Sequence, residues 1–249
     1  MDISGRKVLV TGGAKRIGKA LCEAFAQCGA QVTIHCRDSF EEAAQLASSL
    51  PGNGHRVLQC DLSDTERVND ILKRCGRLDI LVNNASIYKP STILQESAED
   101  ARLQMQVNYF APVSLMSQFA AQQLSEGCII NILDQEVAKE VENFGSYSIS
   151  KRSLRDATLA AALEMAPKIR VNAIAPGPVL PPPGLEHLGM KETLRHVPSG
   201  KKVDINDIAD TCIFLVKNES LTGQVIYVDG GQHLVQRPYW KKNSISPEI

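Results

Sequence analysis

Short apolar runs rich in β-branched residues alternate with longer stretches of helical periodicity along almost the whole chain. Some of these runs, such as Ile80-Leu81-Val82, are apolar at successive positions. A strand of that kind has to be covered on both faces, as happens when helices connect parallel strands. The alternation therefore predicts a single α/β domain, doubly wound, with a seven-stranded parallel sheet and helices on both faces.

The expected elements follow from this pattern. Strands are predicted at Lys7–Val10, Gln31–Cys36, Arg56–Cys60, Leu78–Val82, Cys128–Leu133, Arg170–Ile174 and Gln224–Val228. Helices are predicted at Arg16–Gln27, Ser39–Leu50, Asp64–Cys75, Ala98–Leu124, Ser146–Met165 and Ile205–Val216. No repeat or low-complexity linker divides the chain, so residues 1–249 are expected to form one domain.

The composition narrows the class of protein. Hydrophobic residues make up 43% and charged residues 22%, and the net charge of -1 provides no basic field for nucleic acid or an anionic membrane. No long apolar run and no start typical of a signal peptide are present. The 7 cysteines are scattered without CxxC spacing. We expect reduced, buried thiols, a cytoplasmic protein and no metal site.

The first predicted strand runs into the sequence TGGAKRIG at residues 11–18 and then into a helix. In a strand–turn–helix unit, backbone N–H groups and the positive end of the helix face an anion, and glycine lets the backbone come close. This turn is therefore a candidate pyrophosphate site. A tight turn without a ligand remains the alternative, because the GxGxxG form is not met.

The end of the second predicted strand indicates which dinucleotide is bound. An acid at that position would bind the ribose 2′-hydroxyl of NAD, whereas an arginine accommodates the 2′-phosphate of NADP. Cys36 and Arg37 stand there, and Lys15 adds a second cation. Asp38 opposes a phosphate unless it points to solvent. NADPH is therefore favoured over NADH.

Tyr147 and Lys151 are four residues apart on a predicted helix, so their side chains share one face. A cation beside a phenol favours the phenolate, and we expect Lys151 to lower the pKa of Tyr147 toward neutrality. An acid, Asp134, stands just after the apolar run at residues 128–133. The spacing alone is weak evidence for a catalytic pair, since any tyrosine and lysine four residues apart on an exposed helix face satisfy it.

Two segments interrupt the alternation. Residues 176–198 are rich in proline and lie between a strand and a helix. A connection of this length is expected to act as a substrate loop. Residues 233–249 form a tail with the only tryptophan, Trp240. The tail either covers a subunit interface or frays, and disorder is expected beyond about Lys242.

The motifs together resemble those of the short-chain dehydrogenase/reductase family, whose Rossmann-like fold would span the whole chain. The resemblance rests on TGGAKRIG at 11–18, Asp61-Leu62, NNA at 83–85, Asn108, YSISK at 147–151, PG at 176–177 and VDGG at 228–231. It implies cofactor contacts from Gly12, Lys15, Arg16, Ile17, Gly18, Arg37, Asp61, Leu62, Asn84, Ala85, Ser86, Lys151, Pro176 and Gly177.

Three departures from the common family pattern agree with one another. Arg16 replaces the middle glycine of the turn, Asp134 replaces the usual catalytic serine, and Ser86 replaces the glycine of NNAG. This set resembles the pteridine reductase and dihydromonapterin (dihydrofolate) reductase branch. The resemblance implies that Tyr88 stacks on a pterin ring and that the substrate contacts are Arg16, Ser86, Tyr88, Asp134 and Tyr147. Each departure could also be family drift.

The implied catalytic residues are Asp134, Tyr147, Lys151 and Asn108. Tyr147 would donate a proton, Lys151 would hold the nicotinamide ribose, and Asn108 would anchor a relay water near Lys151. An ionised Asp134 accepts hydrogen bonds only, which favours a substrate ring with N–H donors over a simple ketone. The expected reaction is NADPH-dependent reduction of a dihydropterin to its tetrahydro form.

Two alternatives remain open at this point. One is an NADPH-dependent carbonyl reductase, for instance of 3-oxoacyl thioesters. The other is a catalytically silent NADP-binding protein. The family resemblance also implies a homotetramer. The particular pterin and the strength of the preference for NADPH are not predicted.

Overall fold

A computed structural model describes residues 1–139, 142, 144–181 and 190–235. Within this part of the chain a seven-stranded sheet has the order β3-β2-β1-β4-β5-β6-β7, and every neighbouring pair is parallel. The strands are β1 (Lys7–Val10), β2 (Gln31–Cys36), β3 (Arg56–Gln59), β4 (Ile80–Asn83), β5 (Gly127–Ile132), β6 (Ile169–Pro176) and β7 (Val225–Val228). The predicted doubly wound, single-domain α/β fold is confirmed.

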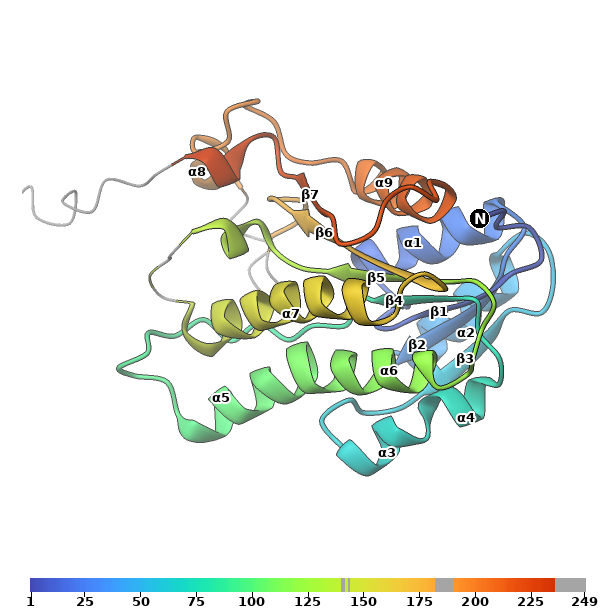
Figure 1. The fold of residues 1–249 in the computed structure, drawn as a ribbon. Helices are drawn as coiled ribbons and strands as arrows, with labels where there is room; N and C mark the ends of the chain where they lie inside the picture. Colours follow the sequence, from blue (N-terminus) through green and yellow to red (C-terminus); the bar gives the residue numbers. More distant parts are fainter. Residues whose placement is uncertain (140–141, 143, 182–189, 236–249) are drawn as a thin grey trace, which may run out of the picture.

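Helices cover both faces of the sheet (Figure 1). One layer contains α1 (Arg16–Gln27), α2 (Phe40–Ser49) and α9 (Ile205–Lys217). The other contains α3 (Thr65–Asn69), α4 (Ile71–Cys75), α5 (Ala98–Met105), the π-helix η1 (Gln106–Phe110), α6 (Ala111–Ala120) and α7 (Gly145–Glu164). Short helical turns lie at η2 (Gln135–Ala138), α8 (Lys191–Leu194) and η4 (Gln232–Leu234).

Strands β4 and β5 lie at the centre of the sheet and are buried along their whole length. Alternate side chains of each strand enter opposite cores, because successive residues of a strand point to opposite faces. Ile130 thus packs beneath α1 and α9, whereas Ile129 packs with α6 and α7. This two-sided burial explains the continuous apolar runs in the sequence.

Most predicted elements agree with the structure to within two residues, but two helices differ. The helix predicted at 64–75 divides into α3 and α4 at Asp70. The helix predicted at 98–124 is interrupted by η1, which contains Asn108, and ends at Ala120. A π-helical turn of this kind changes the direction of the side chains that it carries.

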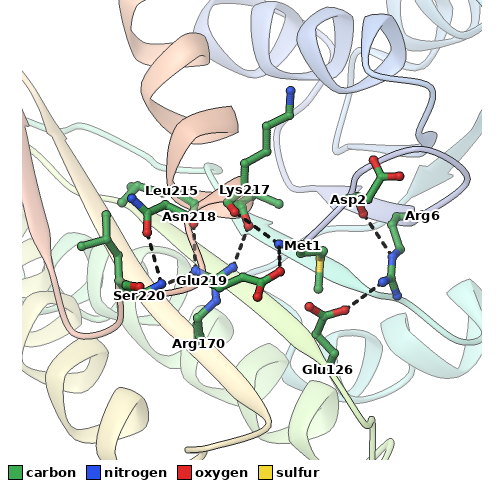
Figure 2. Close-up of polar contacts among 12 residues, drawn as sticks. Met1, Asp2, Arg6, Glu126, Arg170, Leu215, Lys217, Asn218, Glu219 and Ser220 are labelled. Carbon is green, nitrogen blue, oxygen red and sulfur yellow. Dashed lines mark hydrogen bonds and ion pairs between the residues drawn. The ribbon is translucent and has the colours of Figure 1, made fainter.

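A cap at the carboxyl end of α9 connects it to β6. Arg170, on β6, donates to the carbonyl oxygens of Leu215 at 2.8 Å, Val216 at 2.6 Å and Leu221 at 3.1 Å. The Met1 amine donates to the Lys217 carbonyl and pairs with Glu219 at 2.6 Å (Figure 2). Cationic donors at this position bond to the carbonyl groups that the end of the helix leaves unpaired. Their charge also interacts favourably with the negative end of the helix dipole.

Part of the substrate loop and most of the tail, including Trp240, lie outside the described residues. Across the described ranges, no helix combines the length and the apolar character needed to cross a membrane. All 7 cysteines are free, and each is buried except Cys28, which is half-buried.

The cap of α9 generates a stability prediction. Arg170→Leu should lower the free energy of unfolding by about 3 kcal/mol, because the carbonyl groups that it satisfies lose their charged donor. Urea unfolding followed by circular dichroism measures the change. Arg67→Leu, at an exposed position of α3, is the matched control and should change the free energy of unfolding by less than about 0.5 kcal/mol. Equal effects of the two variants would contradict the cap.

Candidate active site

The order of the strands reverses direction between β1 and β4, and such a switch point is where open α/β sheets bind ligands. One hydroxyl joins the two strand ends there. Thr11 Oγ1 accepts from the backbone N–H groups of Asn84 at 2.9 Å and Ala85 at 3.0 Å, and donates to the Val82 carbonyl at 3.3 Å. The motifs at residues 11–18 and 83–85 therefore meet at one edge of the sheet.

Neighbouring backbone and side-chain atoms come so close to this turn that two of its positions require glycine. Asn84 Nδ2 donates to the carbonyl oxygens of Thr11 at 2.9 Å and Gly12 at 3.1 Å. A Cβ added at Gly18 would lie 2.1 Å from the Gly12 carbonyl oxygen, and Gly12 itself has φ of 62°. Helix α1 starts here with no side-chain cap and no acid in its first turn. Its free N–H groups suit an anion such as pyrophosphate.

The His35 side chain holds this turn through a hydrogen bond, and the sequence reasoning missed this residue. The backbone N–H of Gly12 donates to His35 Nδ1 at 3.1 Å, which assigns the ring proton to Nε2, bonded to the Cys60 carbonyl at 3.1 Å. Burial lowers the pKa of His35 to about 4. The imidazole is therefore neutral near pH 7 and serves as a fixed hydrogen-bond acceptor.

The two cations expected at the 2′-phosphate are both paired with acids. Lys15 contacts Glu42 at 2.6 Å, and Arg37 contacts Asp38 at 2.6 Å. All four side chains are largely exposed, and ion pairs of this kind are weak.

The other residues expected to bind the cofactor lie along the same edge of the sheet. Asp61 accepts from the Ser63 N–H at 2.8 Å, and the Gly177 N–H donates to the Val228 carbonyl at 2.9 Å. Ile17 packs against the core beneath the turn. The remaining members are Leu62, which is buried, and Pro176, which ends β6.

Asp134 and Tyr147 are in direct contact. The Tyr147 hydroxyl donates to Asp134 Oδ2 at 2.8 Å, and Asp134 Oδ1 accepts from the backbone N–H of Glu136 at 2.9 Å. Asp134 follows β5 and Tyr147 lies in the first turn of α7, so the fold brings these elements together at the carboxyl edge of the sheet.

The expected effect of Lys151 on Tyr147 is wrong for this structure. The pKa of Tyr147 is raised well above its ordinary value, first by burial and then by the negative charge and hydrogen bond of Asp134. The Lys151 ammonium is buried and donates to the Ile132 carbonyl at 2.9 Å. Burial lowers the pKa of Lys151 to about 8, and Asp134 opposes that shift. Tyr147 is therefore a protonated phenol at neutral pH.

Asn108 lies in the π-turn η1 and bonds to residues other than Lys151. Its Oδ1 accepts from the Ile87 N–H at 2.9 Å and from Ser86 Oγ at 3.1 Å. Its Nδ2 donates to the Ile87 carbonyl at 3.0 Å and to Ser150 Oγ at 3.1 Å. The observed role of this side chain is to hold the segment after β4 against α7, and the relay water stays a prediction.

Two aromatic rings form a wall beside Tyr147. Tyr88 contacts Tyr147 edge to face with ring centroids 4.9 Å apart, and Phe144 lies 5.9 Å from Tyr88. Phe144 was missed by the sequence reasoning, although it directly precedes the helix that carries Tyr147. The two rings are tilted by 42° to each other and together form an apolar boundary beside Tyr147.

Arg16 reaches from the phosphate turn to the substrate loop. Its Nη2 donates to the carbonyl oxygens of Pro181 at 2.7 Å and Leu180 at 3.5 Å. Its backbone has φ of 54°, in the left-handed region that glycine prefers. Turn and loop are thereby in direct contact.

Known proteins resemble this chain over nearly its full length. The family described as enoyl-(acyl carrier protein) reductase matches residues 12–233. Carbonyl reductase family member 4 of Danio rerio is 32% identical over 236 residues, covering 92% of this chain and 99% of that protein. L-xylulose reductase of Mus musculus is 32% identical over 241 residues, covering 93% and 98%.

A solved structure is similar over an even larger share of the chain. FolM alternative dihydrofolate reductase 1 from Brucella canis, complexed with NADP, has a TM-score of 0.89 and 34% sequence identity. The match covers 98% of this chain and 100% of that chain.

The buried ammonium of Lys151 generates a prediction about pH. Its pKa of about 8 lies below the unfolded value near 10.5, so the unfolded chain binds more protons between these values and stability rises with pH. Relative to Lys151→Met, the wild-type protein should gain about 2 kcal/mol of unfolding free energy between pH 7 and 9.5. Urea unfolding of both proteins measures it, and a constant difference would contradict the shift.

Proposed function

Because the chain belongs to the short-chain dehydrogenase/reductase family, we propose that it is an NADPH-dependent reductase of a dihydropterin. The substrate would be of the dihydrobiopterin, dihydromonapterin or dihydrofolate type, reduced to the tetrahydro form. This activity would belong to the oxidoreductases that act on CH–NH groups, the EC 1.5.1 class.

The described residues fit NADP, the ligand named for the Brucella canis structure. Gly12 and Gly18 allow the tight turn, and the uncapped start of α1 would face the pyrophosphate. Arg37 and Lys15 would exchange weak surface ion pairs for the 2′-phosphate. Lys151 would hold the nicotinamide ribose.

The hydrogen bond between Tyr147 and Asp134 is the observation that carries the choice of substrate. A carboxylate cannot donate to a ketone oxygen, but it accepts hydrogen bonds from the ring N–H and amino groups that pterins carry. The Tyr88 ring beside this pair provides a stacking surface for a flat heterocycle. Acceptor and aromatic wall together favour a pterin over a simple carbonyl compound.

When bound, NADPH would supply a hydride to the carbon of a C=N bond and be oxidised to NADP⁺, and the ring nitrogen would take up one proton. Tyr147 carries its phenolic proton at neutral pH and would supply it directly or through water, although its raised pKa disfavours that transfer. Asp134 would orient the phenol and the polar edge of the ring. Arg16 and Ser86 would contact the substrate at the edge of the proposed site.

A carbonyl compound, such as a 3-oxoacyl thioester, is the second candidate substrate class. The carbonyl reductase and L-xylulose reductase relatives favour it. Position 134 weighs against it, because no hydroxyl donor stands there. A catalytically silent NADP-binding protein is a weaker alternative, since Tyr147, Lys151 and Asn108 are all present.

A homotetramer in the cytoplasm also belongs to this proposal. Helices α5 to α7 expose large apolar side chains, including Phe110, Ile149 and Leu163. The 7 free cysteines suit a reducing compartment.

The proposed substrate is tested by following NADPH oxidation with 7,8-dihydrobiopterin, dihydromonapterin, dihydrofolate and an acetoacetyl thioester. One of the dihydropterins should exceed the thioester in kcat/KM. Tyr147→Phe and Asp134→Ala should each lower kcat by about 100-fold, because proton transfer loses its donor or its orienting partner. The Kd for NADPH should be unchanged, and Tyr109→Phe is the matched control. Retained turnover in both site variants would refute the scheme.

Asp134→Ser tests the role of the acid in selecting the substrate. A serine hydroxyl can donate to a carbonyl oxygen, so kcat/KM should fall for the dihydropterin and rise for the thioester. The ratio of the two values should change by about tenfold or more, equivalent to one hydrogen bond. An unchanged ratio would mean that position 134 does not select between these classes.

A further inference from the structure

Glu96 connects the segment that follows Tyr88 to the start of α7, although it belongs neither to the cofactor turn nor to the Asp134–Tyr147 pair. Its Oε2 accepts from the backbone N–H of Ser146 at 2.9 Å and from Ser146 Oγ at 2.7 Å. Ser146 directly precedes Tyr147. The Glu96 carboxylate therefore holds the turn of α7 that presents the proposed proton donor.

The other Glu96 oxygen is bonded in the opposite direction. Gln104 Nε2 donates to Glu96 Oε1 at 2.7 Å, and Gln104 Oε1 accepts from the backbone N–H of Lys89 at 3.0 Å. Gln104 is fully buried on α5. Since Lys89 directly follows Tyr88, a continuous chain of hydrogen bonds runs from the aromatic wall to the start of α7.

The start of α7 is shaped to receive this carboxylate. Gly145 has φ of 44°, and a Cβ there would lie 2.9 Å from Glu96 Oε2 and 3.0 Å from the Ser91 carbonyl oxygen. The helix has no side-chain cap of its own and no acid in its first turn. Glu96 thus supplies, from a distant segment, the negative charge and acceptor that a helix start requires.

We propose that Glu96 is a positioning residue that fixes where Tyr88 lies relative to Tyr147, and hence the shape of the proposed substrate site. The two rings are in edge contact at 4.9 Å, and each is one residue away from an end of the Glu96–Gln104 chain. The proposal rests on the proposed function only in taking Tyr147 as the proton donor.

The donor and acceptor directions in this series of hydrogen bonds suggest a sharp test. Glu96 accepts on both sides, from Ser146 and from Gln104. Glu96→Gln would place an amide N–H₂ against one of these donors and break the chain. The double variant Glu96→Gln/Gln104→Glu restores it, because the new carboxylate accepts from Lys89 and from the new amide, whose oxygen accepts from Ser146. A double-mutant cycle isolates this coupling.

The experiment combines hydrogen–deuterium exchange with kinetics on the full chain. In Glu96→Gln, peptides containing Lys89 and Ser146 should exchange faster, while those from α9 should not change. On the best substrate, kcat/KM should fall about tenfold, as expected for one part-buried hydrogen bond, with the Kd for NADPH unchanged. The double variant should recover both. Glu99→Gln, an equal loss of charge three residues away and exposed, is the matched control.

Two results would overturn the proposal. One is protection and turnover in Glu96→Gln equal to those of Glu99→Gln. The other is failure of the double variant to recover either quantity, which would mean that charge at the helix start matters and the hydrogen-bond chain does not. If the wild-type protein reduces no dihydropterin, the proposed substrate fails, but the exchange data still test Glu96.

Discussion

The hydroxyl of Thr11 connects the ends of β1 and β4, and the site depends on this connection. Its hydrogen bonds to the backbone of Val82, Asn84 and Ala85 hold the two strand ends together at the switch point of the sheet. Asn84 is thereby set above Gly12, where its amide leaves no room for a Cβ at Gly18. Neutral His35 supports the same turn from the opposite side. The shape of this candidate anion-binding turn therefore depends on a few hydrogen bonds between segments distant in the sequence.

A second group of hydrogen bonds determines where the proposed catalytic side chains lie. Asn108 bonds to the backbone of Ile87 and directly to α7. Gln104 bonds to the backbone of Lys89 and reaches α7 through Glu96. The segment that carries Tyr88 is irregular, so its own backbone geometry would not fix the ring. Buried amides on one continuous helical stretch provide that order instead, and the π-turn at η1 is part of the same arrangement.

The sheet was predictable because two-sided burial leaves a clear signal in each strand, and the turn at 11–18 was predictable from its glycines. The break at Asp70 and the π-turn were not, since both depend on packing against other elements. The pKa of Tyr147 was predicted in the wrong direction for a related reason. Spacing on one helix identified Lys151 as its neighbour, whereas the acceptor of the phenol, Asp134, comes from a different element. Sequence spacing reports local neighbours and not the partners brought in by the fold.

Arg16 carries a consequence for how such a chain evolves or is engineered. Its left-handed backbone costs about 1 kcal/mol that glycine would avoid. Selection for thermal stability alone would therefore push this position toward glycine and lose the guanidinium that reaches Pro181. A left-handed arginine kept at this cost is what a stability–activity trade-off would produce under the proposed role of Arg16 at the substrate.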